Sequence, residues 1–269
     1  MNSQQLKEFA RDIRVTTLEA FKTPLFGHIG GAMSICDVLA VLYGSVMRCD
    51  PKNPQWAERD KLVLSKGHAG PALYAALCLK GYFPREMLTE LNQGGGHLPS
   101  HVDRTKTPGI DMTAGSLGQG LSAACGIALG DRLSGFDSRT YCIVGDGELN
   151  EGQNWEAIMF AAQYKLGNLT LFVDNNKIQL DGYTNDVMSL GNLKQKLEAS
   201  GWSVVQIDGH DVAAISDAIK ATSGQLPGAV ILDTVKGKGV DFVEAAAPNN
   251  HHLTFTLAQL DDAIAALNA

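Results

Sequence analysis

The sequence predicts an α/β fold in which a mostly parallel sheet of about five or more strands is flanked by helices. Short apolar segments alternate with longer segments of helical length, which is the pattern of parallel strands joined by crossover helices. The short segments are rich in Val, Ile and Leu without polar alternation, so their strands should be buried on both faces. With 269 residues, 45% of them hydrophobic, the chain is long enough for a large domain with a substantial core.

Five strands are expected, at residues 61–65, 139–145, 169–174, 203–207 and 229–235. Helices are expected between and around them, at residues 4–21, 34–47, 71–79, 117–133, 154–166, 190–200, 212–222 and 257–267. No internal repeat, low-complexity tract or interdomain linker interrupts this pattern. Residues 1–269 are therefore expected to form a single domain.

Several residues indicate where helices begin and end. Pro71 suits the first turn of a helix, and Gly81 and Gly167 suit helix ends. Ser34, with Asp37 three residues later, resembles a capping box. Residues 92–109 show no helical or strand pattern, and a loop of this length suggests a function beyond connection.

Composition narrows the class of protein. A formal net charge of −7 without a Lys/Arg cluster argues against general nucleic-acid binding. Five cysteines, at positions without disulfide or Cys-x-x-Cys spacing, indicate reduced thiols in a cytosol. The amino terminus is polar, and no run of about 18 apolar residues would span a membrane. The expected protein is cytoplasmic, with neither nucleic acid nor membrane as a partner.

Two polar segments follow neighbouring predicted strands, Gly145-Asp-Gly-Glu148 and Asp174-Asn-Asn-Lys-Ile178. Both should lie at the carboxyl ends of parallel strands, where open α/β sheets bind ligands. Asp146, Asn176 and the backbone carbonyl of Ile178 would supply three of the roughly six oxygen ligands that Mg²⁺ needs, leaving places for phosphate oxygens and water. Gly147 has no Cβ and would let the backbone approach a phosphate.

A glycine-rich segment runs through Gly115-Ser-Leu-Gly-Gln-Gly120. Its order, G-x-x-G-x-G, differs from the dinucleotide-binding fingerprint, and no phosphate-loop Lys-Ser/Thr follows it. A classical Rossmann or nucleoside triphosphate site is therefore disfavoured. The segment either contacts a cofactor through its backbone or is a glycine-rich helix start packed closely on a strand.

Taken together and in order, these segments resemble the amino-terminal, thiamine diphosphate-binding half of transketolases. The resemblance runs from about residue 11 to about residue 238 and rests on Gly27-His28, Ser65-Lys-Gly-His68, His101, Thr113-Ala-Gly-Ser-Leu-Gly-Gln-Gly120, Gly145-Asp-Gly147 and Asn176. It implies thiamine diphosphate and Mg²⁺ as cofactors, with Ca²⁺ or Mn²⁺ as alternative metals bound by Asp146, Asn176 and Ile178. The cofactor-binding residues that it implies are His68, Gly115, Ser116, Leu117, Gly145, Asp146, Gly147, Glu148, Asn176 and Ile178.

The resemblance also gives catalytic roles to His28, His101 and His251, which would line the substrate channel and exchange protons with substrate hydroxyls. His97 is close enough in sequence to be the counterpart of His101. His252 competes with His251, because Pro248-Asn-Asn-His-His-Leu253 lacks the glycine that usually follows this histidine in the family. For His28, His68 and His101, the alternative is a structural histidine with satisfied hydrogen bonds.

Glu151 and Glu156 flank the start of the helix predicted at residues 154–166. Acidic residues are favourable near a helix amino terminus, which is explanation enough for both. The resemblance instead places Glu151 at an interface with a second copy of the chain and Glu156 in the same acidic network, where close carboxylates would share a proton. Further on, Lys236-Gly-Lys-Gly239 is either a flexible exit from a strand or a segment that closes over the active site.

Single-chain transketolases continue into pyrimidine-binding and carboxyl-terminal domains, which this sequence lacks. The resemblance therefore implies one subunit of a split transketolase, which transfers a two-carbon ketol unit from a ketose (phosphate) to an aldose (phosphate). A carboxyl-terminal transketolase subunit would supply the catalytic Glu and the pyrimidine site, with two copies of each chain in a heterotetramer. The alternatives are a split deoxyxylulose phosphate synthase-like or ketoacid-decarboxylating subunit, and a non-catalytic binding subunit.

Overall fold

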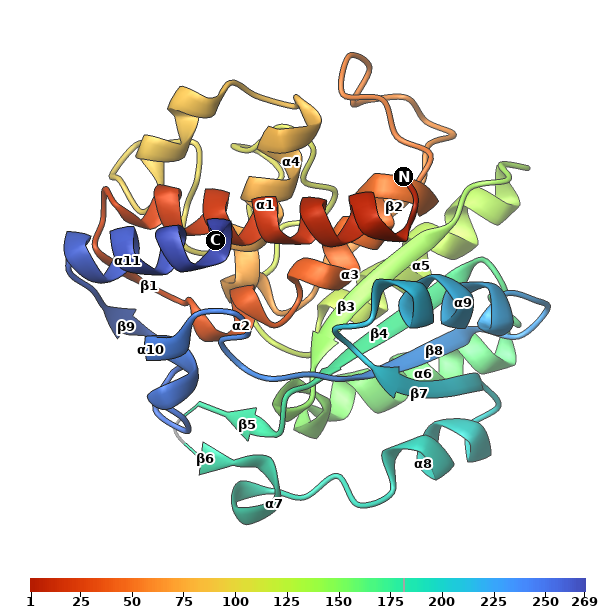
Figure 1. Cartoon of the computed structure of the whole chain (residues 1–269). Helices are drawn as coiled ribbons and strands as arrows, with labels where there is room; N and C mark the ends of the chain where they lie inside the picture. Colours follow the sequence, from red (N-terminus) through yellow and green to blue (C-terminus); the bar gives the residue numbers. More distant parts are fainter. Residues whose placement is uncertain (181) are drawn as a thin grey trace.

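The computed structural model describes residues 1–180 and 182–269 and has an α/β architecture (Figure 1). Five parallel strands form one sheet in the order β2-β3-β4-β8-β7. These strands are β2 Lys61–Leu64, β3 Thr140–Gly145, β4 Leu169–Asn175, β7 Ser203–Asp208 and β8 Gly228–Asp233. The predicted fold class and its five strands are confirmed.

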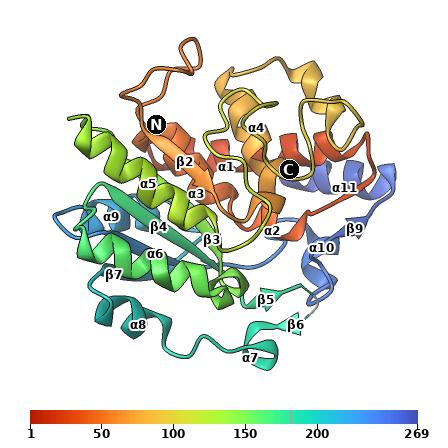
Figure 2. The same cartoon turned by 180° about the vertical axis from the view of Figure 1, so that it is seen from behind.

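Helices cover both faces of the sheet, and each face has its own apolar core. On one face, α1 (Ser3–Phe21), α3 (Cys36–Val41) and α9 (Val212–Thr222) pack over strand side chains that include Tyr141 and Phe172. On the other face, α5 (Gly120–Leu133) and α6 (Gly152–Gln163) cover Cys142 and Leu171 (Figure 2). Successive side chains of a strand point to opposite faces, so burial on both faces explains why these strands are continuously apolar.

The other helices are α2 (Gly30–Met33), α4 (Gly70–Lys80), α7 (Thr184–Val187), α8 (Leu193–Ala199), α10 (Asp241–Ala245) and α11 (Leu257–Asn268). The chain also forms a π-helical turn, η1 (Leu42–Val46), and three 3-10 helices, η2 (Gly67–Ala69), η3 (Arg85–Glu90) and η4 (Gly147–Asn150). Within the described part of the chain, no helix has both the length and the apolar composition needed to cross a bilayer.

Two short antiparallel strand pairs lie outside the main sheet. One joins β1 (Phe26–Gly27) to β9 (Leu253–Thr254), and the other joins β5 (Ile178–Gln179) to β6 (Gly182–Tyr183). The pairing of β1 with β9 brings His28 close to His251 and His252, although more than two hundred residues of sequence lie between them. Residues near the two ends of the chain therefore meet beside the sheet.

The helix predicted at residues 34–47 differs most from the structure. α3 begins only at Cys36 and has no side-chain cap, and the chain passes into a π-helical turn at Leu42. The capping box at Ser34 is wrong, because the buried Ser34 hydroxyl donates instead to the carboxylate of Asp174 at 2.7 Å. A tertiary hydrogen bond thus takes the group that the sequence pattern assigned to the helix.

Other helix ends were predicted with mixed success. Pro71 lies in the first turn of α4, and Gly81 ends that helix with a φ of 87°, as predicted. Gly167 does not end α6: the left-handed position is taken by Lys165, with a φ of 50°. Gly167 is instead required for close packing, because an added Cβ would lie 2.1 Å from the carbonyl oxygen of Gly224. Residues 92–109 form a loop, as predicted.

The buried carboxylate of Asp174, in β4, joins the ends of three strands. It accepts hydrogen bonds from Lys66 Nζ at 2.5 Å, Thr234 Oγ1 at 2.5 Å and Asn176 Nδ2 at 2.7 Å, in addition to Ser34. The Lys66 side chain is only 2% exposed and Asp174 is fully buried. Burial alone would raise the pKa of Asp174, but Lys66 and the hydrogen bonds hold that pKa below its usual value.

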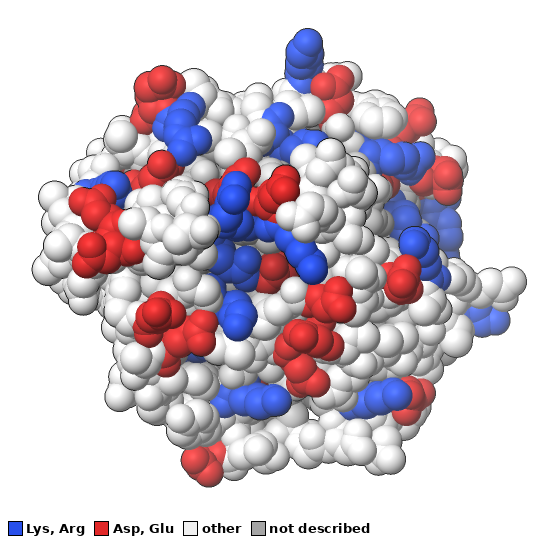
Figure 3. Space-filling model, viewed as in Figure 1, with Lys and Arg blue, Asp and Glu red and all other residues white. Residues whose placement is uncertain are grey.

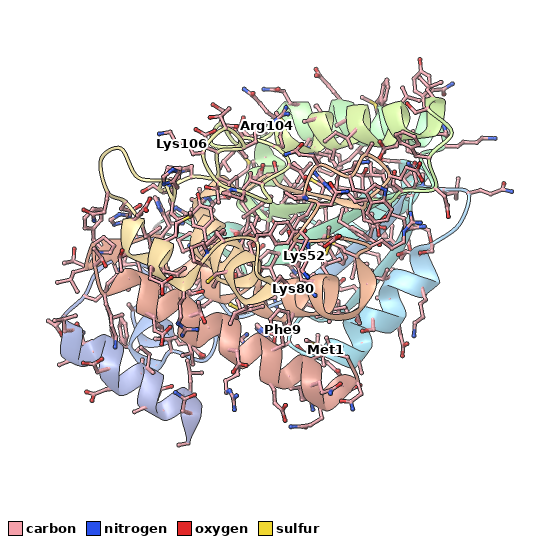
Figure 4. All side chains as sticks on the ribbon, turned by 90° about the horizontal axis from the view of Figure 1, so that it is seen from above. Met1, Phe9, Lys52, Lys80, Arg104 and Lys106 are labelled. Carbon is pink, nitrogen blue, oxygen red and sulfur yellow. The ribbon has the colours of Figure 1, made fainter. Side chains whose placement is uncertain are left out.

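Charged side chains of both signs are interspersed on the surface. On the face shown in Figure 3, Lys and Arg alternate with Asp and Glu, and no continuous basic stripe of the kind that binds nucleic acid is visible there. Figure 4 labels Lys52, Lys80, Arg104 and Lys106, which belong to separate regions: the segment before β2, the end of α4, and the loop at residues 92–109. These cations do not gather on one helix or strand.

Lys66→Met should lower the free energy of unfolding by about 3–5 kcal/mol, because it leaves the buried carboxylate of Asp174 without its ion-pair partner. Urea unfolding at neutral pH measures this change. The stabilisation should also be lost as the pH falls through the lowered pKa of Asp174 in the folded protein, since the carboxylate then takes up a proton.

Lys177→Met is the matched control, because its ammonium group is exposed and lies 3.7 Å from Asp233. It should change the stability by less than about 1 kcal/mol. Adding Asp174→Asn to Lys66→Met should recover part of the loss, since no unpaired charge then remains buried. Equal losses for Lys66→Met and the control would contradict the proposed importance of the pair.

Candidate active site

A cavity of about 600 Å³ opens at the carboxyl edge of the main sheet. Its walls come from the segments that follow β2, β3, β4 and β8, which carry Lys66, Asp146, Asn176 and Lys236. Because all these strands are parallel, their carboxyl ends meet at one edge, which is the usual ligand-binding edge of such sheets. Segments from the two ends of the chain close one side of the cavity through His28 and His251.

The structure brings most of the predicted site residues into the wall of this cavity. Those that line it are His28, His68, His101, Gly115, Leu117, Gly145, Asp146, Gly147, Glu148, Glu151, Asn176, Ile178 and His251. Ser116 and Glu156 are exposed and do not line it. The sequence therefore predicted which residues lie together around the cavity, and the contacts of each residue bear on its role.

Asp146 follows β3 and is only 2% exposed. Its carboxylate accepts hydrogen bonds from the backbone N–H of Gly147 at 2.8 Å and of Lys177 at 2.6 Å, and from the Thr184 hydroxyl at 3.2 Å. Burial and the nearby charge of Asp174 raise the pKa of Asp146 to about 6. Within the described residues this carboxylate has no ion-pair partner, so a bound cation would stabilise its charged form.

The other two predicted metal ligands lie in the segment after β4. The Asn176 amide donates to Asp174 at 2.7 Å, which turns its oxygen away from that carboxylate, and the oxygen accepts the N–H of Ile178 at 3.1 Å. The carbonyl of Ile178 accepts a hydrogen bond from Lys236 Nζ at 3.4 Å. One carboxylate, one amide and one carbonyl form the hard-oxygen donor set that suits Mg²⁺. The described residues contain no cluster of three or more His, Cys, Asp and Glu side chains fit to hold a metal.

Two lysines make part of the cavity cationic. Lys66 is 1% exposed and Lys236 is 3% exposed, and both line the cavity together with His68. Gly31 lies beside Lys66 and His68: a Cβ added there would lie 3.3 Å from Lys66 Nζ and 3.4 Å from His68 Nε2. This region suits an anionic group such as a diphosphate.

Glu148 connects three segments around the cavity. Its buried carboxylate accepts the Ser65 hydroxyl, the Gly118 N–H at 3.0 Å and the Gly145 N–H at 3.1 Å. Burial raises the pKa of Glu148, while these hydrogen bonds oppose that shift. Both oxygens are occupied by protein donors, so the geometry supports a role in positioning the glycine-rich segment more than direct contact with a ligand.

Five histidine rings lie close to one another, and four of them line the cavity. The centroid of His28 lies 5.2 Å from His101, 5.2 Å from His251 and 4.8 Å from His252, and His68 lies 4.7 Å from His251. His28 Nδ1 is buried and has no hydrogen-bond partner among the described residues.

Burial favours the neutral form of the four imidazoles that line the cavity. It lowers the pKa of His28 to about 4, with further contributions from His252 and His101, and the pKa of His251 to about 3, with the charge of Lys236 as the next cause. Burial also lowers the pKa values of His68 and His101. Neutral imidazoles can both accept and donate protons in hydrogen bonds to substrate hydroxyls.

The structure distinguishes the histidines that the sequence left open. His101 lines the cavity, whereas His97 is exposed and its Nδ1 lies 2.6 Å from a carboxylate oxygen of Glu90. His251 lines the cavity, whereas His252 packs its ring 5.9 Å from Phe26 and touches His28. Geometry therefore favours His101 and His251 over their neighbours.

Glu151 precedes α6 and lines the cavity, and Glu156 lies within α6 on the exposed surface. Their predicted role at an interface between copies of the chain stays a prediction.

Lys66 was not predicted as a site residue from the sequence, and the segment that contains Lys236 was given two alternative interpretations. The signal for both was present in Ser65-Lys-Gly-His68 and Lys236-Gly-Lys-Gly239, each directly after a strand.

Comparison with known proteins agrees with this geometry. Residues 5–254 match the family described as "Transketolase, thiamine diphosphate binding domain". The chain is 52% identical over 260 residues to the 6-deoxy-6-sulfo-D-fructose transketolase subunit SqwG of Clostridium sp. (strain MSTE9), covering 94% of each chain. It is 38% identical over 255 residues to an apulose-4-phosphate transketolase subunit of Actinobacillus succinogenes, covering 94% of this chain and 92% of that one.

Among solved structures, the transketolase of Campylobacter jejuni superposes with a TM-score of 0.93 at 32% identity. The match covers 100% of this chain but 43% of that one. Both separate subunits are matched over nearly their whole length, and the predicted family is confirmed. The chain belongs to the transketolase family, as the thiamine diphosphate binding subunit of a split transketolase.

Proposed function

We propose that this chain anchors thiamine diphosphate and a divalent metal in a transketolase that transfers a two-carbon ketol unit from a ketose (phosphate) to an aldose (phosphate). The observation that carries the proposal is the cavity itself. It joins an oxygen donor set and two buried lysines at one side to a cluster of neutral histidines at the other. The first side suits a metal-bound diphosphate, and the second suits a polyhydroxylated sugar.

Asp146, Asn176 and the carbonyl of Ile178 would hold Mg²⁺, with Ca²⁺ or Mn²⁺ as alternatives. The buried carboxylate of Asp146, which lacks an ion-pair partner among the described residues, supports this assignment. Lys66, Lys236 and His68 would bind the phosphate oxygens. The backbone at Gly115, Ser116, Gly145 and Gly147 would complete the cofactor site, and Leu117 would support the bent cofactor from below.

When bound, thiamine diphosphate supplies the carbon nucleophile that ketol transfer requires. The task of this chain is to bind and orient groups and to move protons. His28, His101 and His251 would accept and donate protons at substrate hydroxyls, which their neutral state permits.

A second subunit would supply the pyrimidine-binding domain, the catalytic Glu and most contacts to the substrate's anionic group. Two copies of each chain are expected, with Glu151 and Glu156 near the contact between copies. The 52% identity to a subunit named for 6-deoxy-6-sulfo-D-fructose makes that sulfonated ketose the first donor to test. Five free cysteines support a cytoplasmic location.

The chain should be inactive alone and should transfer a two-carbon unit once its second subunit, thiamine diphosphate and Mg²⁺ are present. The assay follows aldehyde release from 6-deoxy-6-sulfo-D-fructose, or from a ketose phosphate, in the presence of an aldose phosphate. Dialysis against a chelator should remove the activity, and added Mg²⁺ should restore it. Consumption of pyruvate without ketol transfer would identify the deoxyxylulose phosphate synthase-like or decarboxylating alternative instead.

Asp146→Asn should weaken thiamine diphosphate binding in the presence of Mg²⁺ by about 100-fold or more, because it removes the only charged metal ligand of the set. Isothermal titration of the two-subunit complex measures the affinity. Asp186→Asn is the control, since Asp186 is exposed in the neighbouring helix α7. Near-normal affinity in Asp146→Asn would refute the metal assignment.

His28→Ala should lower kcat/KM for the ketose donor by about 10- to 100-fold, the usual effect of losing one or two hydrogen bonds to a substrate. Affinity for thiamine diphosphate should stay within about threefold, because His28 lies on the histidine side of the cavity. His97→Ala, in an exposed histidine, should leave both quantities unchanged. A loss of cofactor affinity as large as the loss in kcat/KM would place His28 at the cofactor instead.

A further inference from the structure

We propose that Arg14, Asp37 and His210 form a positioning unit that fixes residues 235–239 and thereby holds Lys236 in the cavity. This inference rests on the proposed function, in which Lys236 meets the diphosphate. None of the three residues lines the cavity. Any effect on the cofactor must therefore pass through the segment that they hold.

The unit contacts the segment on both sides of Lys236. On one side, the backbone N–H of Val235 donates to His210 Nε2 at 2.9 Å. On the other side, Arg14 Nε donates to the carbonyl of Lys238 at 3.0 Å. Arg14 lies in helix α1 and His210 in the turn after β7, so distant parts of the chain converge on the segment.

Asp37 joins the two contacts into one unit. Its carboxylate accepts hydrogen bonds from both terminal nitrogens of Arg14, one of them at 3.2 Å. The same carboxylate lies 2.8 Å from His210 Nδ1. The side chains of Arg14, Asp37 and His210 are only 9%, 8% and 15% exposed. Burial alone would raise the pKa of Asp37, but the hydrogen bond from His210 and the charge and hydrogen bonds of Arg14 hold that pKa below its usual value. The carboxylate is therefore an acceptor.

This arrangement fixes the tautomer of His210. A backbone N–H can only donate, so Nε2 must accept from Val235 without a proton of its own. The proton of the neutral ring is then on Nδ1, where it is donated to Asp37. An acid that orients a histidine through one nitrogen, while the other nitrogen makes the functional contact, is a familiar device around metal ligands. Here the contact is to a backbone amide.

Residues 235–239 have no regular secondary structure, so hydrogen bonds to other parts of the chain have to fix their position. Gly237 and Gly239 have φ angles of 96° and 85°, so the segment contains two positions of high backbone freedom. Arg14 also packs against the second of these: a Cβ on Gly239 would lie 3.2 Å from its Cδ. Further ties are the bonds from Gly237 N–H to Gly30 and from Asn250 to the carbonyl of Lys236, both at 3.0 Å.

A double-mutant cycle between His210 and Lys236 tests the inference. Thiamine diphosphate affinity is measured with Mg²⁺ in the two-subunit complex for His210→Ala, Lys236→Ala and the double variant. We expect Lys236→Ala to weaken binding by about 10- to 100-fold, as for a charge-assisted contact, and His210→Ala by about 3- to 10-fold. The double variant should bind no more weakly than Lys236→Ala within a factor of about two, because His210 acts through Lys236.

The outcomes separate this inference from the proposed function. Losses that multiply in the double variant, or a folded His210→Ala protein with normal affinity, would overturn the positioning unit alone. Unchanged affinity in Lys236→Ala would overturn the diphosphate role of Lys236 and the inference with it. The control pair, His97→Ala with Lys236→Ala, should show only the effect of Lys236→Ala.

A conservative variant guards against a general loss of folding. His210→Gln keeps a side-chain oxygen within reach of the Val235 N–H, so it should retain affinity within about threefold and a normal kcat at saturating cofactor. If His210→Ala does not fold, the same cycle is measured with Asp37→Asn, which removes the charge that orients His210. A His210→Gln affinity as low as that of Lys236→Ala would contradict the role of the Val235 hydrogen bond.

Discussion

The geometry of the candidate site depends on the buried carboxylate of Asp174. A charge in a protein interior is tolerated only where it is paired and hydrogen-bonded. Lys66 must therefore stay against Asp174, which fixes the turn after β2 that also carries His68. The same carboxylate orients the amide of Asn176. The positions of Lys66, His68 and Asn176 thus follow from an ion pair that belongs to the fold.

This arrangement divides the cavity into two chemical environments. The region around Lys66 and Lys236 is cationic and suits an anion, whereas the region around His28 and His251 is neutral because burial and the same lysines disfavour added positive charge. One set of buried lysines therefore has two effects: it favours a diphosphate, and it keeps the neighbouring imidazoles able to accept protons. The two halves of the proposed chemistry are coupled through these charges.

The strands of the sheet and many residues of the candidate site could be predicted from the sequence, because strand ends and turn residues are local signals. Asp146, Asn176 and the strands before them were predicted from apolar segments followed by polar residues. The capping box at Ser34 failed because its hydroxyl bonds to Asp174, 140 residues away, and no local pattern reports such a contact. The helix end predicted at Gly167 is wrong for the same reason: a glycine is needed there because the backbone packs closely against Gly224. The Asp37–His210 contact likewise joins segments that share no sequence motif.

The carboxylates that line the cavity bear on the proposal that a second chain completes the site. Three carboxylates line it among the described residues. Asp146 and Glu148 are held by backbone and hydroxyl donors, and Glu151 lies at the exposed start of α6. None is both buried and free to exchange a proton with a cofactor ring. The apolar side chains of Leu117 and Leu180 on the cavity wall are 36% and 65% exposed. Under the proposed function, a second subunit that covers them would exclude water and supply the acid that the proposal assigns to it.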